Sequence, residues 1–247
     1  HPRNAVIAAA LRRATEARRA LLAARGAGVR GHIGGVVLIN GSLGSGGAER
    51  QYVNTAIGLH TASQSGRFIG ERDVVGPVRV ICRSLHGRSG ADFFAPVLRE
   101  AGLTTDEYEH FPEFGGRPRA SSALVVFDFL DHLPGQMRTG VLRLADQLRY
   151  DDPQVVHIWQ DGSVLATGLA ALLAGVPRII LGVRSAPPPD RFERDKPEYR
   201  VIYKCLIEAG GVVIIANSAR SAVRYEEWLD LKPGSVRVIP NGVQAFD

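Results

Sequence analysis

The sequence predicts an α/β fold in which a doubly wound parallel sheet follows a basic N-terminal helix. After Gly31, short apolar runs alternate with helical patterns, which is the order of elements that a doubly wound sheet requires. Each run is continuous, as expected for parallel strands buried on both faces. The expected strands are residues 36–40, 77–83, 154–159, 178–183, 212–217 and 236–240.

Helical patterns separate these strands and cover residues 48–62, 91–101, 135–148, 162–174, 198–209 and 218–229. Residues 120–131 suit either a strand or a helix, because residues 124–127 form a compact apolar run while the spacing through Leu130 also fits a helix. We expect loops at residues 63–76, 113–120 and 185–197. Loops at the carboxyl ends of parallel strands line the ligand crevice of such folds.

Composition indicates a globular protein with one large domain or two small ones. The chain has 247 residues, of which 45% are hydrophobic and 22% are charged. No apolar run approaches the ~20 residues that a membrane-spanning helix needs. Cys82 and Cys205 lie far apart without metal-ligand spacing, so we expect reduced thiols in a cytoplasmic protein.

The positive charge of the chain is concentrated at its start. Residues 1–31 hold seven arginines against one acid, Glu16, whereas the rest of the chain holds 23 basic and 24 acidic residues. The sequence pI of 9.5 is therefore a property of this arm and does not indicate a nucleic-acid-binding domain.

Within this arm, residues 4–25 are predicted to form a helix with a weak apolar stripe of Ile7, Leu11, Ala14 and Leu21. Two interpretations are open. The helix is either a peripheral anchor to anionic lipid at the inner membrane face or to a partner, or the solvated, loosely packed tail of a preceding domain.

The expected domain organisation has three parts. Residues 1–31 form the helical arm and a glycine-rich joint, residues 32–240 form the α/β domain, and residues 241–247 begin an interdomain linker. Because the chain starts with His1 and its one methionine is Met137, we expect it to be a piece of a longer protein.

A glycine-rich turn at residues 41–50 follows the first expected strand and leads into a helix. Such a turn is a ready anion site, because the free N–H groups of the first helical turn point outward with the positive end of the helix dipole. It does not match the dinucleotide fingerprint, whose third glycine would fall at Glu49. It does not match the nucleoside-triphosphate loop either, because the segment has no lysine. Hydride transfer and ATP hydrolysis therefore lose support.

Further landmarks stand at strand ends in a fixed order. They are Gly46-Gly47-Ala48-Glu49-Arg50, His157-Ile158-Trp159, residues 172–177, Arg184-Ser185, Ala216-Asn217-Ser218 and Ile239-Pro240-Asn241-Gly242-Val243. This order resembles family 4 of the retaining glycosyltransferases, especially members that build bacterial surface polysaccharides.

The resemblance implies one half of a GT-B fold, in which two Rossmann-like domains face each other. The first domain mainly recognises the acceptor, and the second holds the nucleotide-sugar donor. The chain stops at Asp247, near the point where the first domain leads into the second. We therefore expect the acceptor-side domain, inactive by itself, with the C-terminal donor domain of the same protein as its partner.

For the donor side, the resemblance implies that Gly46 and Gly47 present backbone N–H groups to the donor diphosphate or the sugar. Arg50, one turn further, either adds positive charge or faces solvent or the second domain. Many relatives carry His-x-His where this chain has His157 and Trp159. A histidine role therefore cannot be carried over, and no catalytic residue is assigned.

For the acceptor side, the resemblance implies a set of strand-end residues, namely Trp159, Gln160, Asp161, Arg184, Asn217 and Ser218. Trp159 either stacks on a sugar ring or is a core tryptophan that caps the sheet. Asp161 also suits the N-cap of the following helix.

The remaining acceptor-side residues have alternatives too. Arg184 holds a phosphate or a carboxylate, or it forms a salt bridge in the region of Asp190. Asn217 and Ser218 also fit N-capping of the helix that follows them.

The implied reaction moves a sugar from a nucleotide-sugar donor to a glycan or lipid-linked acceptor with retained configuration. Helix N-termini and basic side chains would stabilise the leaving diphosphate, so neither a metal nor another cofactor is expected. Two alternatives stay open. One is a sugar-nucleotide epimerase on the same architecture, and the other is a non-catalytic glycan-binding or scaffold domain.

Overall fold

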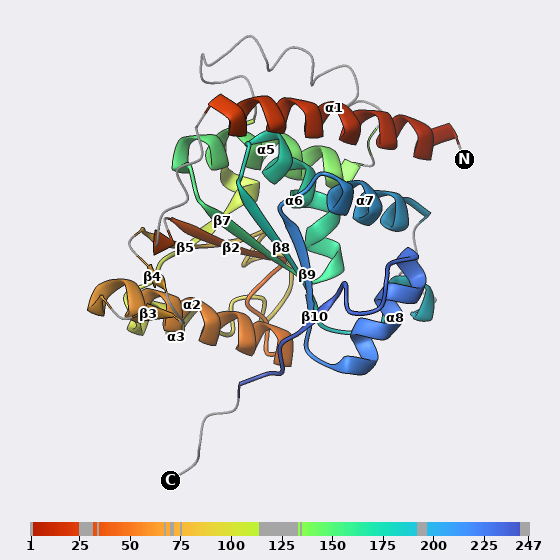
Figure 1. Ribbon diagram of the computed structural model, residues 1–247. Coiled ribbons are helices and arrows are strands. Elements are labelled where there is room, and N and C mark those ends of the chain that lie inside the picture. Colours follow the sequence, from red (N-terminus) through yellow and green to blue (C-terminus); the bar gives the residue numbers. More distant parts are fainter. Residues whose placement is uncertain are drawn as a thin grey trace.

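A seven-stranded, all-parallel sheet forms the centre of the protein, which confirms the predicted fold class (Figure 1). The computed structural model describes residues 2–24, 32–33, 35–66, 68–69, 72–74, 76–113, 133, 135–191 and 197–242. The strand order is β10-β9-β8-β7-β2-β5-β6. The strands are β2 (Val36–Asn40), β5 (Val78–Cys82), β6 (Thr105–Glu107), β7 (Val155–Trp159), β8 (Arg178–Val183), β9 (Val212–Ala216) and β10 (Arg237–Val238).

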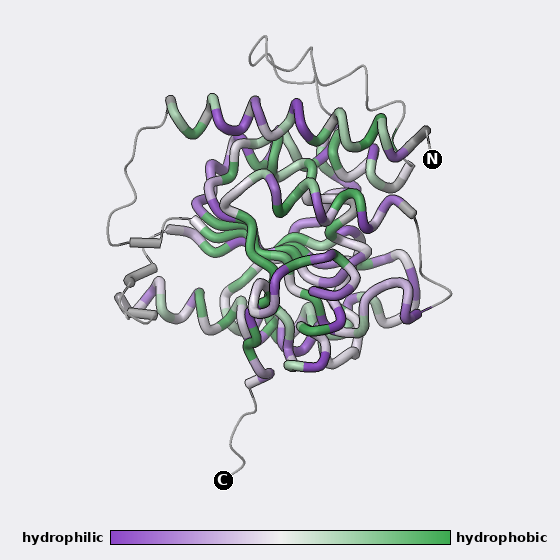
Figure 2. Tube along the Cα trace, turned by 45° about the vertical axis from the view of Figure 1, so that its right-hand side comes forward, coloured by the Kyte–Doolittle hydropathy of each residue, from purple (hydrophilic) through white to green (hydrophobic). Residues whose placement is uncertain are grey.

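Helices cover both faces of this sheet. They are α1 (Pro2–Ala24), α2 (Gly47–Ser65), α3 (Ala95–Glu100), α5 (Gly135–Asp151), α6 (Asp161–Leu173), α7 (Pro197–Glu208) and α8 (Ala219–Leu229). Successive residues of β2 belong to different cores: Val36 and Leu38 pack with α2 and α3, whereas Val37 and Ile39 pack with α5, α6 and α7. Figure 2 shows the resulting hydrophobic centre. This two-sided burial explains the continuous apolar runs.

The order of the strands places the topological switch point of the sheet between β2 and β7. From β2 the chain builds outward through β5 and β6 on one side, and then returns to add β7 on the other. In open α/β sheets, ligands bind outside the carboxyl ends of the strands at such a switch point. The turns that follow β2 and β7 therefore frame the expected site.

Three segments differ from the predicted elements. Strand β6 was not predicted, because Thr105, Asp106 and Glu107 are polar and pair with β5 through the backbone at the sheet edge. The predicted loop at residues 63–76 includes the last turn of α2. It also includes β3 (Phe68–Ile69) and β4 (Arg72–Val74), which form a small sheet with β1 (His32–Ile33). The predicted helix at residues 91–101 is helical only in α3.

Some predictions fall outside the described residues. They include the ambiguous segment 120–131, most of the expected loop 113–120, and part of the loop 185–197. The described residues around these gaps form two short 3-10 helices, η1 (Tyr108–His110) and η3 (Pro188–Asp190).

The basic helix α1 lies across α6 and α7 and is part of the domain core (Figure 1). Ile7, Leu11 and Ala14 are buried in the same core as the sheet. The interpretations of this helix as a loosely packed tail, or as a lipid anchor through its apolar stripe, are therefore wrong for these three residues, because they face the protein. None of the described helices has the length and apolarity needed to cross a bilayer.

Arg18 of α1 fixes this helix through buried backbone carbonyls. Its side chain is 2% exposed. Nε donates to Val176 O at 2.9 Å, Nη2 to Pro177 O at 2.7 Å, and Nη1 to Ala209 O at 3.1 Å and to Gly210 O. These carbonyls belong to the turns that follow α6 and α7, where a cation is favourable. One arginine thus ties three helices together.

Replacing this cation gives the first test of the packing of α1. We expect Arg18→Met to lower the free energy of unfolding by about 2–4 kcal/mol, because it leaves several buried carbonyls without donors. Urea unfolding followed by circular dichroism measures the change. The control Arg19→Gln, at the exposed neighbouring position, should leave stability almost unchanged. Equal stability of the two variants would contradict the assigned role.

Candidate functional site

The turns after β2 and β7 meet at the switch point, as the sequence predicts for strand-end residues. A side-chain hydrogen bond joins them directly, since Gln160 Nε2 donates to Glu49 Oε1 at 3.0 Å. Glu49 lies in the first turn of α2, and Gln160 directly follows β7. The glycine-rich turn and the residues after Trp159 therefore form one continuous rim.

The start of α2 combines an open backbone with a nearby carboxylate. Gly46 is the N-cap residue without a side-chain cap. A Cβ on Gly46 would collide with the carboxylate of Glu49, so any other residue there requires the Glu49 side chain to move. A Cβ on Gly47 would meet no atom within 4 Å, and Gly46, Gly47 and Arg50 are exposed. The carboxylate of Glu49 is favourable beside the helix N-terminus, and it shares the space where an anion would bind.

Gln160 has a backbone conformation that L-residues rarely adopt. Its φ is 66° and its ψ is 148°, a region that only glycine occupies easily. Its N–H donates to Gly182 O at 2.9 Å, and its side chain binds Glu49. Strain of this kind, about 1–3 kcal/mol, persists only where neighbouring contacts impose it, and it is concentrated at functional sites.

Asp161 connects three helices below the rim. It is the first residue of α6 and not its N-cap, so the capping role predicted for it is wrong; Gln160 occupies that position. Its buried Oδ1 accepts hydrogen bonds from Tyr203 Oη at 2.7 Å and Tyr225 Oη at 2.6 Å, and Oδ2 pairs with Arg191. Burial, followed by the charge of Asp161, raises the pKa of both tyrosines.

Trp159 is 1% exposed and is packed among aromatic rings and a cation. The ring centroid of Tyr52 lies 5.6 Å away in an edge-on arrangement, and that of His157 lies 4.7 Å away. Arg184 stacks on the indole, with Cζ 3.8 Å from the ring centroid. The structure therefore favours the core interpretation of Trp159 over sugar stacking, because Arg184 covers the ring.

Arg184 is a partly buried cation with few partners. Nη1 donates to Asn241 Oδ1 at 3.2 Å, while Nε is buried and has no partner among the described residues. Burial lowers its pKa to about 10. The alternative salt bridge with Asp190 is absent from the described structure. Asp190 accepts instead from Arg224 Nε at 2.9 Å and Arg224 Nη2 at 2.7 Å.

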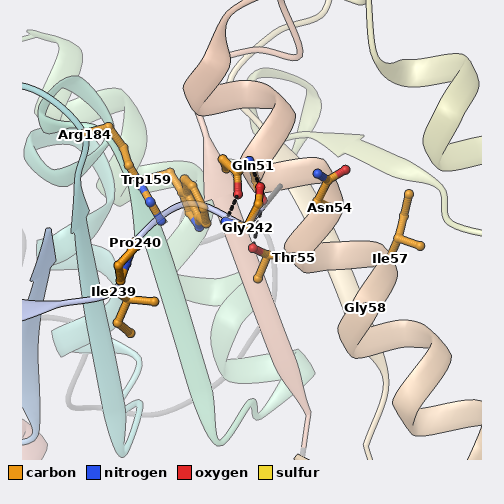
Figure 3. Close-up of a pocket in the computed structure, with 10 residues that line it drawn as sticks. All are labelled: Gln51, Asn54, Thr55, Ile57, Gly58, Trp159, Arg184, Ile239, Pro240 and Gly242. Carbon is orange, nitrogen blue, oxygen red and sulfur yellow. Dashed lines mark hydrogen bonds between the residues drawn. The ribbon is translucent and has the colours of Figure 1, made fainter. Parts of the chain in front are cut away.

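A cavity of about 540 Å³ opens between α2 and the chain that follows β10 (Figure 3). Its wall consists of Gln51, Asn54, Thr55, Ile57, Gly58, Trp159, Arg184, Ile239, Pro240 and Gly242. The side chain of Gln51 links α2 to the chain after β10, because Nε2 donates to Gly242 O at 2.8 Å and Oε1 accepts from Gly242 N at 3.1 Å. The cavity lies within the ~300–1,000 Å³ range of small-molecule sites.

The structure brings only part of the predicted set to this cavity. Trp159 and Arg184 line it, whereas Asn217 and Ser218 are not among its lining residues. Ser218 is the N-cap of α8 and accepts from Ser221 N at 3.1 Å, which confirms the capping alternative for Ser218 and not for Asn217. Sequence reasoning missed Gln51, Asn54 and Thr55, although their spacing of three and four residues places polar groups on one face of a helix.

His157 is buried beneath this site as a neutral group. Burial, and secondarily the charge of Arg184, lower its pKa to about 3. Its Nε2 has no hydrogen-bond partner within the described part of the chain. The described residues also contain no group of three or more metal-ligating side chains.

Comparisons with known proteins agree with this architecture. The model of Glycosyltransferase Family 4 matches residues 77–245. The Vi polysaccharide biosynthesis protein VipC/TviE of Salmonella typhi is 36% identical over 215 residues, which are 86% of this chain and 37% of that protein. The chain thus spans little more than a third of the length of this curated relative.

One solved structure shows the same fold at low identity. The crystal structure of Anabaena Alr3699/HepE in complex with UDP and glucose has a TM-score of 0.53 and 12% identity, over 85% of this chain and 44% of that chain. The apo form of the lipopolysaccharide outer core galactosyltransferase WaaB has a TM-score of 0.49 and 14% identity, over 85% of this chain and 46% of that chain.

Removing the carboxylate below the rim tests the role of Asp161. We expect Asp161→Ala to lower the free energy of unfolding by about 2–4 kcal/mol, since two tyrosine hydroxyls and Arg191 lose their shared acceptor. The matched control is Asp190→Ala, which removes the exposed partner of Arg224 and should cost much less. Chemical unfolding compares the two variants. Equal losses would show that Asp161 contributes no more than a surface ion pair.

The neutral state of His157 predicts a pH dependence of stability. Its pKa is about 3 in the folded protein and about 6.5 when unfolded, so only the unfolded chain binds this proton between those values. The free energy of unfolding is therefore not reduced by His157 above about pH 6.5, and it falls as the pH falls from there towards pH 3. Between about pH 7 and pH 5, the wild type should lose about 2 kcal/mol more than His157→Gln.

Urea unfolding at both pH values measures this difference. His86→Gln is the control, because the side chain of His86 is 77% exposed, and it should follow the wild type. The same pH dependence for His157→Gln and for the wild type would contradict a neutral buried His157.

Proposed function

We propose a function for this chain, which belongs to glycosyltransferase family 4. It is the acceptor-side domain of a retaining, hexosyltransferase-like enzyme. The enzyme would move a sugar from a nucleotide-sugar donor to a glycan or lipid-linked acceptor. The Vi polysaccharide relative supports a role in the biosynthesis of a bacterial surface polysaccharide. The proposed location is cytoplasmic, and the exposed Arg12, Arg13 and Arg19 of α1 offer a peripheral contact with anionic lipid.

The observation that carries this proposal is the position of the cavity. It lies beside the switch point, where Trp159 ends β7, Arg184 follows the neighbouring β8, and α2 supplies polar groups. The uncapped start of α2 stands on the same edge of the sheet. An acceptor in the cavity and a diphosphate at the helix start would therefore be near each other, as sugar transfer requires.

The chemistry proposed for this half of the site is electrostatic. Backbone N–H groups at Gly46 and Gly47 would face the diphosphate that leaves from the donor, and the helix dipole would stabilise its charge. Arg50 would add positive charge from the next turn. We propose that no metal or other cofactor takes part. The donor itself would be held mainly by a second domain of the same protein.

A protein that includes this chain and its natural continuation tests the proposal. Incubated with a panel of nucleotide sugars and with glycan or lipid-linked acceptors, it should release nucleotide and transfer sugar. Gly47→Asp should lower kcat/KM by about 100- to 1,000-fold, because it places a negative charge where the diphosphate needs positive potential. The structure accommodates this side chain, since a Cβ at Gly47 meets no atom within 4 Å.

The matched control is Gly135→Asp. Gly135 begins α5, and a Cβ there also meets no atom within 4 Å. This variant should keep wild-type activity. Absence of turnover with every donor and acceptor would reject the transferase and leave a glycan-binding domain. Activity of Gly47→Asp at the wild-type level would reject the role of the α2 turn.

A further inference from the structure

The cavity between α2 and the chain after β10 has an unbalanced charge. Among the described residues that line it, Arg184 is the only charged one, and none is acidic. Gln51, Asn54 and Thr55 supply neutral polar groups on the α2 side (Figure 3). The side chain of Gln51 is engaged with Gly242, and Thr55 Oγ1 donates to Gln51 O at 2.8 Å. Asn54 is exposed and completes a polar wall opposite the cation.

Arg184 differs from the buried Arg18, which donates to four backbone carbonyls, and from two arginines that pair with carboxylates. Arg79 pairs with Asp106 and Asp151, and Arg191 pairs with Asp161. Arg184 has no carboxylate within ion-pair distance among the described residues, and its one hydrogen bond there goes to the neutral Asn241. A cation withdrawn from water without an anion is costly. The lowered pKa of Arg184, about 10, reflects this burial.

Packing also fixes the direction of this cation. The indole of Trp159 supports one face of the guanidinium at 3.8 Å, and Trp159 is held by Tyr52 and His157. A planar guanidinium held in this way loses little entropy when it binds an oxyanion with two parallel N–H groups. Trp159 is thus a positioning residue for Arg184.

We infer that this cavity is a subsite for the acceptor, and that the acceptor carries a negative charge there, a carboxylate or a phosphate, with Arg184 as its counter-ion. The assignment to the acceptor rests on the proposed function. The preference for an anion rests on the cavity alone, because Arg184 is the one charged group that the described part of the chain contributes to its wall.

Binding of simple sugars to the 247-residue chain tests this inference. The probes are glucuronate, glucose 1-phosphate and neutral glucose, which share a ring and differ in charge. Indole N–H signals in nuclear magnetic resonance spectra report binding, and Trp228→Phe assigns the signal of Trp159, since the chain has two tryptophans. At least one anionic sugar should shift the Trp159 signal with an affinity at least tenfold higher than glucose.

Three substitutions make the result specific. Arg184→Gln should weaken the binding of the anionic sugar at least tenfold and leave glucose unaffected. Arg184→Lys should keep the charge, lose the planar fork and fall between the two. The control Arg178→Gln removes the exposed arginine at the opposite end of the same strand and should match the wild type. Added salt should weaken only the anionic sugars.

The outcomes separate the sources of charge and can overturn the inference. Preference for glucuronate indicates an acidic sugar, and preference for glucose 1-phosphate indicates a phosphorylated acceptor. Three results would each overturn the inference. They are an affinity for glucose equal to that for the anionic sugars, an affinity of Arg184→Gln for the anionic sugar equal to that of the wild type, and no shift of the Trp159 signal with any probe at its solubility limit. If Arg184→Gln fails to fold, Arg184→Lys and the salt dependence decide.

Failure of this inference is distinguishable from failure of the proposed function, because binding is measured without transfer. Charge-dependent binding with no turnover of the longer protein would remove the transferase and keep the anion site. Sugar transfer with charge-independent binding would keep the transferase and remove the anion site.

Discussion

The parallel pairing of β2 with β7 is the constraint on which the rest of this structure depends. Residues 36–39 pair with residues 155–158, although more than a hundred residues separate them in the chain. The segments between them first build β5 and β6 on the other side of β2. The connections that leave β2 and β7 therefore run in opposite directions, and they do not cover the turns that follow these two strands. The contact of Gln160 with Glu49 follows from this pairing.

Buried charges in this domain are compensated to different extents. Asp161 and Arg18 are compensated from inside the domain, by two tyrosines and an arginine in one case and by backbone carbonyls in the other. Both hold helices in place. Arg184 is left largely uncompensated in the wall of a cavity. Asp161 and Arg18 thus stabilise the fold, whereas Arg184 has an N–H group without a described partner, which supports its proposed role in ligand binding.

The sequence predicted the sheet well because burial on both faces leaves a local signal. The runs at β2, β7 and β8 need no information from elsewhere in the chain. Strand β6 has no such signal, since Thr105–Glu107 pairs through its backbone at the edge. The burial of α1 was not predictable either, because its alanine-rich stripe gains a partner only when α6 and α7 are in place.

The site was predicted only in part for a similar reason. Strand ends identified Trp159 and Arg184, but their mutual stacking depends on the register of β7 against β8. Nothing in the sequence indicates the positive φ of Gln160, because glutamine normally avoids this backbone conformation. The hydrogen bonds of Gln51 to Gly242 join residues 191 positions apart, so the helix pattern shows a polar face without showing its partner.

Glu49 changes the interpretation of the glycine-rich turn as a free anion site. Its carboxylate lies against Gly46 at the helix start, and Gln160 holds it there. A diphosphate that approaches the N–H groups of Gly46 and Gly47 therefore meets a fixed negative charge. The nearby Arg50 is exposed, and exposed charges are screened by solvent and salt. In the proposed function, much of the positive potential for the leaving group must then come from the donor domain. In that proposal, the turn would contribute to diphosphate binding mainly when the second domain closes over it.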